Sequence, residues 1–410
     1  MSMPSPSILS RPRRALSMPE FVAVLAFTFA VVAFSIDAML PALPQIAAEM
    51  VPGDVNRAQL VLTAFMIGLG GGTLFTGPIS DAIGRKPTII GGFVIYLIGA
   101  VAAMLANSIE ALLIARVIQG IGASGPRIAV LALVRDLLQG REMARVMSLV
   151  NMLFILVPAI APSIGQAIIA IAGWRGVFGA FIVFALLASS WIGLRQPETL
   201  PAERRRPLHL RTLAAAVREA LSDRDVVICT ATIALGFGQM FALLSSAQQL
   251  FGEAYARGDQ FPLWFAAMAL LSACGTILNA RLVVRLGMRR IASTAYAAQA
   301  IFACIMLILV TTGAIPEPWR FAAFFVWAVS LFTMAGVTFG NLNAIALHRM
   351  GHIAGMVASL VAALSTVGAM LIAAPVGQLY NGTPVPVIAA AAVCSAVAWL
   401  LMRRLTPGST

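Results

Sequence analysis

The residue in this chain best suited to proton chemistry is Asp37, which lies inside a long apolar segment. It is the only acid within any of about a dozen such segments, in a chain that has 16 acids among 410 residues. A carboxylate at bilayer depth costs at least ~2.5–3.5 kcal/mol on insertion scales. Because a proton neutralises a carboxylate, we expect Asp37 to couple proton movement to transport.

Two arginines lie inside one later apolar segment. Arg116 is at a depth similar to that of Asp37, counted in helical rise from the same side. A pair between Asp37 and Arg116, direct or through water, would keep Asp37 ionised until a proton or a substrate competes. The alternative is that Arg116 snorkels to the outer surface. Arg127 lies on the same helix face as Arg116. We expect it either to attract an anionic or carbonyl-rich substrate or to pair with backbone carbonyls.

Composition sets the class of element that must position these residues. Hydrophobic residues make up 60% of the chain and charged residues 11%, and the mean hydropathy is +0.92, which excludes a soluble globular domain. Apolar segments long enough to cross the hydrocarbon layer recur along the chain. We therefore predict an all-α integral membrane protein with twelve transmembrane helices at 21–40, 57–76, 88–106, 110–132, 144–171, 176–194, 225–249, 261–281, 291–312, 319–343, 353–378 and 385–402.

The net charge of +12 reports topology. If the N-terminus is cytoplasmic, most basic residues fall in the inner loops, among them the cluster at 204–206. The outer segments then hold only Arg57, Arg175, Arg257 and Arg320. This asymmetry predicts that both termini are cytoplasmic. Because topology accounts for the positive charge, we expect no nucleic-acid partner.

The chain divides at an arginine- and proline-rich stretch. We predict a cytoplasmic tail at 1–20, a six-helix bundle at 21–194, a cytoplasmic linker at 195–224, a second six-helix bundle at 225–402 and a tail at 403–410. Gly84-Arg85-Lys86-Pro87 in the first half is echoed by a glycine and two arginines at 287–290 in the second. Two pseudo-symmetric bundles around a central cavity are the expected arrangement.

The loop at 77–87 contains Gly77, Asp81, Gly84, Arg85 and Lys86 in the order G-x-x-x-D-x-x-G-R-K. It resembles the signature between helices two and three of the major facilitator superfamily. An acid at a helix end beside a glycine turn and two cations can form a charge clasp between helix termini. The resemblance implies that this loop latches the two halves together on the cytoplasmic side.

Further motifs resemble one branch of that superfamily, the drug:proton antiporters related to bicyclomycin and chloramphenicol resistance. Arg116 and Gln119 begin a run similar to the superfamily's R-x-x-Q-G-x-G. Asp37 begins a run similar to the branch's D-x-Y-L-P-x-x-P, with Met39 in place of the tyrosine. The fifth span resembles the branch's antiporter motif at Pro158, Ala161, Pro162 and Gly165, although Val157, Ala161 and Gln166 stand where the fuller form has glycines.

The resemblance implies a proton-coupled multidrug efflux transporter of the bacterial inner membrane that works by alternating access. Its expected partners are small lipophilic molecules, protons and the lipid bilayer, and we expect a monomer. Gln119, Arg127, Gln239 and Asn341 are candidates for the substrate cavity, although glutamine and asparagine in spans often bond helix to helix. Export of a metabolite such as an amino acid or sugar is the alternative function.

A membrane enzyme is the third class of function. The chain has no His/Cys set at metal spacing, no nucleophile–base pair and no phosphate-binding loop. We therefore expect no catalytic residues, no metal and no cofactor.

Overall fold

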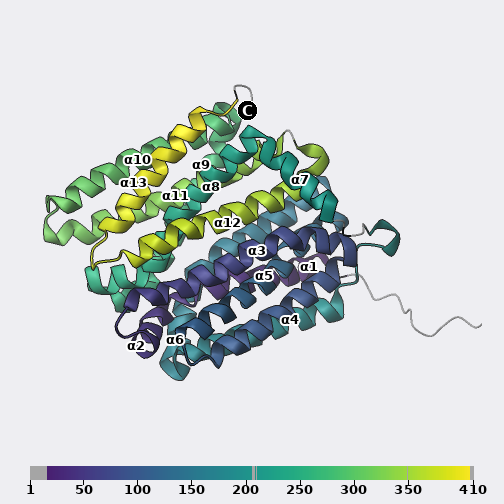
Figure 1. Ribbon diagram of the computed structural model, residues 1–410, viewed down its shortest axis with the longest axis horizontal. Helices are drawn as coiled ribbons and strands as arrows, with labels where there is room; N and C mark the ends of the chain where they lie inside the picture. Colours follow the sequence, from purple (N-terminus) through teal and green to yellow (C-terminus); the bar gives the residue numbers. More distant parts are fainter. Residues whose placement is uncertain (1–15, 206–207, 209, 349, 407–410) are drawn as a thin grey trace, which may run out of the picture.

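The computed structural model describes residues 16–205, 208, 210–348 and 350–406, and these fold into long helices (Figure 1). The predicted tails fall partly outside these residues, at 1–15 and 407–410, as does Arg206 of the predicted linker. The first half contains α1 (Met18–Asp37), α2 (Leu43–Met50), α3 (Leu60–Ile83), α4 (Arg85–Met104), α5 (Ile109–Leu137) and α6 (Gly140–Arg195). After α7 (Leu210–Ser222), the second half contains α8 (Arg224–Gln249), α9 (Phe261–Leu286), α10 (Met288–Thr311), α11 (Glu317–His348), α12 (Ala354–Gln378) and α13 (Val385–Arg403).

The twelve predicted spans are confirmed. In the described part of the chain, eleven helical stretches are long and apolar enough to cross a membrane. One of them lies in α6, which is two helices joined across a kink at Gly173. The predicted spans 144–171 and 176–194 fall on either side of that kink, so the fifth and sixth spans follow each other without a loop.

The helices pack as two bundles. In the first half, α5 packs on α3 and α4, and α1 packs on α6. In the second half, α8 packs on α12, α10 on α13 and α9 on α11. The halves meet chiefly where α3 contacts α12 and where α6 contacts α9, and Figure 1 shows α3 and α12 side by side at that boundary.

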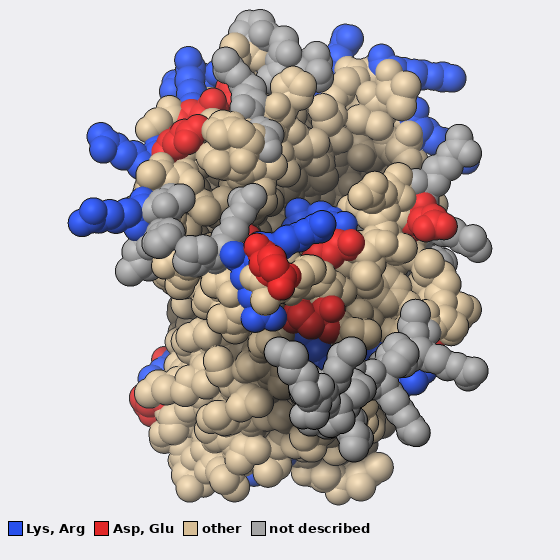
Figure 2. All heavy atoms as spheres, turned by 90° about the vertical axis from the view of Figure 1, so that its right-hand side faces the viewer, with Lys and Arg blue, Asp and Glu red and all other residues tan. Residues whose placement is uncertain are grey.

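One helix was not predicted. α7 lies within the predicted linker 195–224 and packs on α8 and α12, with Leu213, Ala216 and Ala220 buried. His352 Nε2 and Glu219 Oε1, 2.8 Å apart, join α7 to the short helical turn before α12. We call this end of the molecule the linker end and the opposite end, which holds α2, the far end. Figure 2 views the linker end, where acidic and basic side chains gather near the centre.

The kink in α6 depends on one backbone conformation. Gly173 has φ 65° and ψ −175°, a region that residues with a Cβ rarely adopt. A Cβ on this residue would have open space around it. The requirement for glycine is therefore conformational and not a matter of packing.

We expect Gly173→Ala to lower the free energy of unfolding by about 1–3 kcal/mol, because alanine must adopt the same strained backbone. Gly179→Ala is the matched control, since Gly179 lies in the same helix, has helical geometry and also has open space where a Cβ would lie. The control should be neutral or more stable by up to about 1 kcal/mol. Thermal unfolding of both purified variants in detergent measures the difference, and equal stabilities would contradict the strain argument.

Candidate functional site

Asp37 is the last residue of α1, at a point where the chain continues through a short 3-10 turn. Its side chain is buried, with 6% of the residue exposed. Among the described residues, it has no hydrogen-bond or ion-pair partner. Neither carboxylate oxygen of Asp37 is fully enclosed by the protein. The carboxyl group is therefore uncompensated but reachable.

Arg116 is fully buried and satisfied by uncharged oxygens. It donates to Gln119 Oε1 at 2.7 Å and to the backbone oxygens of Ser35 and Val61 at 3.0 and 3.2 Å. It makes no ion pair with Asp37 or with any other acid in the described chain. Because Arg116 is 0% exposed, the snorkelling alternative is wrong. The guanidinium instead joins α5 to α1 and α3. Its contact on α1 is Ser35, two residues before Asp37.

Gln119 and the fifth-span motif complete the surroundings of Asp37. Gln119 is 0% exposed and braces Arg116, so it does not line open space in this structure. The motif residues Pro158, Ala161 and Pro162 lie in the first part of α6. Gly165 of the same motif faces the backbone oxygen of Ala38, and a Cβ there would overlap with that oxygen. The motif therefore packs directly against the end of α1.

The loop motif forms a charge cluster at the linker end. Gly84 turns the chain into α4 with φ 111°, and Arg85 follows it. Arg85 Nη1 donates to Asp81 Oδ1 at 2.5 Å and to Ser80 Oγ at 3.1 Å, and its Nε donates to Asp136 Oδ2 at 2.8 Å. All these partners belong to the first half. The cluster joins α3, α4 and α5 into one unit.

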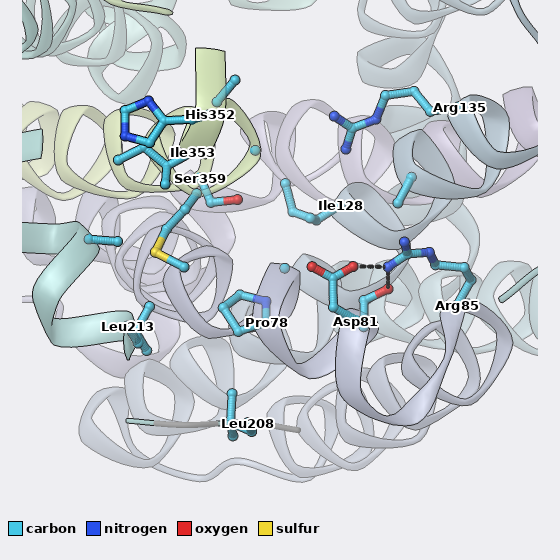
Figure 3. A pocket seen from close by; sticks show the side chains of 17 residues that line it. Pro78, Asp81, Arg85, Ile128, Arg135, Leu208, Leu213, His352, Ile353 and Ser359 are labelled. Carbon is cyan, nitrogen blue, oxygen red and sulfur yellow. Dashed lines mark hydrogen bonds and ion pairs between the residues drawn. The ribbon is translucent and has the colours of Figure 1, made fainter. Parts of the chain in front are cut away.

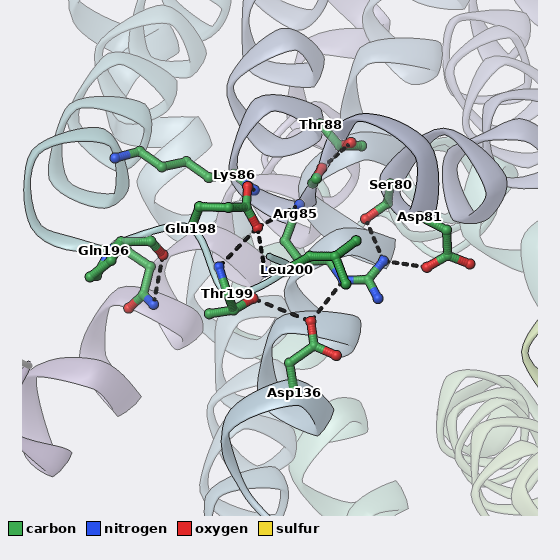
Figure 4. Close-up of polar contacts among 12 residues, drawn as sticks. Ser80, Asp81, Arg85, Lys86, Thr88, Asp136, Gln196, Glu198, Thr199 and Leu200 are labelled. Atoms are coloured by element: carbon green, nitrogen blue, oxygen red, sulfur yellow. Dashed lines mark hydrogen bonds and ion pairs between the residues drawn. The ribbon is translucent and has the colours of Figure 1, made fainter. Parts of the chain in front are cut away.

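Glu198, just after α6, binds the same loop through its backbone (Figure 4). Its carboxylate accepts from the backbone N–H groups of Arg85 and Lys86, both at 3.0 Å. It also accepts from the N–H groups of Thr199 and Leu200, both at 2.8 Å. The first N–H groups of α4 have no partner within the helix, so the carboxylate caps them and opposes the positive end of the helix dipole. This contact fixes the start of the linker to the first half.

A cavity of about 410 Å³ separates the loop motif from the second half (Figure 3). Pro78 and Asp81 line it from α3, Ile353 lines it from the short helical turn before α12, Ser359 lines it from α12, and Leu213 lines it from α7. Asp81 is paired only with Arg85 among the described residues, so no bond from Asp81 crosses to α12. The latch expected here is open in this structure.

At the far end, uncharged side chains join the two halves. Asn56 Nδ2 donates to the backbone oxygens of Gln378 and Tyr380 at 3.2 and 2.9 Å. In return, Gln378 Nε2 donates to the backbone oxygen of Asn56 at 2.9 Å. Gln249 Nε2 donates to Asn56 Oδ1 at 3.1 Å, and Gln59 Nε2 donates to Gln249 Oε1. We call this set the amide clasp; its members are Asn56, Gln59, Ser246, Gln249, Gln378 and Tyr380.

The remaining candidates lie apart from Asp37. Gln239 in α8 is fully buried and accepts from Ser395 Oγ at 2.9 Å. Asn341 in α11 donates to Asn279 Oδ1 at 2.7 Å. Both bonds join helices within the second half. Arg127 is half-buried and has no hydrogen bond, ion pair or ring contact with any residue that the structure describes.

Comparison with known proteins places the chain in a family. Residues 25–373 match the family model of the Major Facilitator Superfamily. The chain belongs to this superfamily. It is 27% identical to a bicyclomycin resistance protein homolog of Haemophilus influenzae over 94% of this chain and 96% of that protein. It is 32% identical to a chloramphenicol resistance protein of Pseudomonas aeruginosa over 57% of this chain and 55% of that protein.

Solved structures show the same fold. A D-xylose–proton symporter superposes with a TM-score of 0.77 at 15% identity, over 96% of this chain and 99% of that chain. The xylose transporter XylE of Escherichia coli superposes with a TM-score of 0.73 at 14% identity, over 95% of this chain and 97% of that chain. The protein is thus a multi-pass membrane transporter related to drug-resistance efflux proteins, and not an enzyme.

Two parts of this transporter escaped sequence reasoning. The amide clasp had a weak signal, because Asn56 and Gln59 lie one helical turn apart beside a span and Gln248-Gln249 ends another span. Glu198 had none, because its partners are backbone groups. The amide clasp and Glu198 each join two stretches of chain that are far apart in the sequence.

We expect Asn56→Leu to open the far end, because it removes three hydrogen bonds between the halves. At about 0.5–1.5 kcal/mol each, their loss should shift the closed-to-open ratio by roughly tenfold or more. Spin labels at exposed Asp54 and Asn381 would report this as longer distances in pulsed electron resonance. Asn107→Leu removes an exposed amide at the far end that makes no hydrogen bond within the described chain, and it should leave the distances unchanged. Identical distributions in both variants would contradict a closing role for the clasp.

We expect Glu198→Ala to destabilise the linker end by about 1–3 kcal/mol, because it leaves backbone donors unpaired. The amides of Arg85, Lys86, Thr199 and Leu200 should then exchange hydrogen faster. Hydrogen–deuterium exchange with mass spectrometry measures the corresponding peptides.

Glu203→Ala is the control for that substitution. Glu203 is an exposed acid in the same segment and makes no hydrogen bond within the described chain. Its removal should leave exchange at the start of α4 unchanged. If both variants exchange alike, Glu198 does not anchor the linker.

Proposed function

We propose that this transporter exports small lipophilic compounds, drugs included, from the bacterial cytoplasm in exchange for protons. It would lie in the inner membrane with both termini in the cytoplasm. The observation that carries the proposal is the isolated carboxyl group of Asp37 at the end of α1. The names of the drug-resistance relatives support the class of substrate.

The chemistry of Asp37 supports a proton site. A charged carboxylate within a spanning segment is costly, and the neutral acid removes most of that cost. Arg116 does not neutralise Asp37, because its donors are taken by Gln119 and two backbone oxygens. A proton is therefore the partner that this carboxyl group lacks.

Alternating access gives the proton site its direction. With the amide clasp open and the linker end closed, Asp37 would take up a proton from outside and the substrate would leave. With the clasp closed and the loop motif apart from α12, as here, the proton would be released inward and substrate would enter. The contact of Gly165 with Ala38 would transmit the tilt of α6 to the end of α1. The membrane potential adds ~2.3 kcal/mol per charge per 100 mV.

We expect Asp37→Asn to abolish uptake driven by a pH gradient, because asparagine cannot exchange a proton. In proteoliposomes with an acidic lumen, one-proton exchange sustains up to a roughly tenfold substrate ratio per pH unit. The variant should give a ratio near one. A panel of chloramphenicol, bicyclomycin and 1-naphthylacetate tests the substrate class.

Asp54→Asn is the control for this substitution. Asp54 is an exposed acid at the far end and has no ion pair among the described residues. This variant should accumulate substrate as the unmodified protein does. If Asp37→Asn keeps gradient-driven accumulation, the proton site lies elsewhere.

A further inference from the structure

Arg127 differs from the other arginines of the first half. Four of those near the helix ends are paired with carboxylates: Arg57 with Glu110, Arg175 with Glu49, Arg195 with Glu20, and Arg85 with Asp81 and Asp136. Arg135, in the last turn of α5, has no such partner among the described residues, but it is exposed, whereas Arg127 is half-buried two turns further into the helix. Arg116 is bonded to an amide and two carbonyls. Within the described part of the chain, Arg127 has neither kind of partner, so backbone pairing, one of its two expected roles, is not observed.

The guanidinium of Arg127 lies well inside α5. Arg127 is ten residues before Leu137 at the end of the helix, roughly 15 Å along the helix axis. This distance exceeds the length of an arginine side chain. The head group of Arg127 therefore does not reach the end of α5, and it lies within the predicted span 110–132.

Its helix face is turned toward the interior of the bundle. Arg127 follows Arg116 by eleven residues, which places the two within roughly 20° around the helix axis. Arg116 contacts α1 and α3, so this face points into the first half. Ile114 and Ile121, which are 64% and 42% exposed, lie roughly 140° and 120° away from Arg127 around the helix.

Open space adjoins the guanidinium of Arg127. The residue is only half-buried, and none of its side-chain nitrogens is fully enclosed by the protein. The described acids of this half lie at helix ends or in the segments between helices. Asp37, at the end of α1, lies near the level of Arg116, about 16 Å from Arg127 along the axis of α5. No carboxylate of the first half is thus positioned to neutralise Arg127.

We propose that Arg127 is the anion-binding point of the substrate site, so that the exported compounds carry a carboxylate or a similar oxyanion on an apolar body. This inference rests on the proposed export function. The planar fork of a guanidinium matches a carboxylate with two parallel hydrogen bonds. An unpaired cation within a spanning segment is costly, and a bound oxyanion removes that cost.

Anion export is compatible with proton exchange. An anion that leaves and a proton that enters both move positive charge inward. The inside-negative membrane potential therefore drives both movements in the same direction. Asp37 and Arg127 lie far enough apart along the bundle that one substrate does not have to displace the proton directly.

Equilibrium binding tests the assignment without any gradient. The probes are 1-naphthylacetate and 1-naphthylacetamide, which share a ring system and differ in charge. The full-length protein in nanodiscs should bind the carboxylate about tenfold to a hundredfold more tightly than the amide. Arg127→Gln should remove this preference while leaving affinity for the amide within about twofold, and Arg127→Lys should keep part of it, since lysine retains the charge but not the fork.

Arg135→Gln is the matched control. It removes the same charge from α5 at an exposed position that lines the cavity at the linker end, and it should keep the full preference. Equal binding of the two probes by the unmodified protein, binding of neither, or a preference that survives Arg127→Gln would each overturn the proposal. Loss of the preference in Arg127→Gln together with gradient-driven transport by Asp37→Asn would reject the proton site and leave the anion site standing.

Discussion

A charge inside a membrane must find its partners within the protein or in water that the protein admits, and this constraint organises the first half of the transporter. Arg116 has hydrogen-bond partners on α1, α3 and α5 and holds these three helices together. Because it is satisfied by carbonyls and an amide, it leaves Asp37 without a counter-ion. Among the residues that the structure describes, Arg127 is left without partners as well. The proposed exchange assigns a proton to the first of these and a substrate to the second.

The contacts between the halves and the contacts within the first half use different chemistry. Between the halves, the far end closes through amides and backbone oxygens. Within the first half, arginine–carboxylate pairs join elements at both ends, through Arg85 at the linker end and through Arg57 and Arg175 at the far end. Amide bonds between halves exchange readily for bonds to water, with a small net change in free energy. Ion pairs at the linker end bind α3, α4 and α5 within one half and leave a cavity toward the other. The closed far end and open linker end follow from this division.

Hydropathy was sufficient to predict the twelve spans, because each has to cover the same thickness of hydrocarbon. The depth of Arg116 could also be counted from the sequence, but its partners could not, since they depend on how each helix is rotated about its axis. Asn56 and Gln378, which are 322 positions apart, meet only after both halves have packed. Glu198 binds backbone groups that every residue possesses, so no side-chain pattern marks it.

Glu198 and α7 also set how far the two bundles can separate. The chain is fastened to the first half as far as Leu200, and α7 docks on the second half from Leu210 onward. Residues 201–209 are the covalent tether between these two docking points, with a reach of roughly 30 Å when fully extended. A tether this short permits the halves to tilt about their shared boundary while limiting translation apart. In the proposed exchange cycle, this connection would limit how far the two halves move apart at each change of conformation.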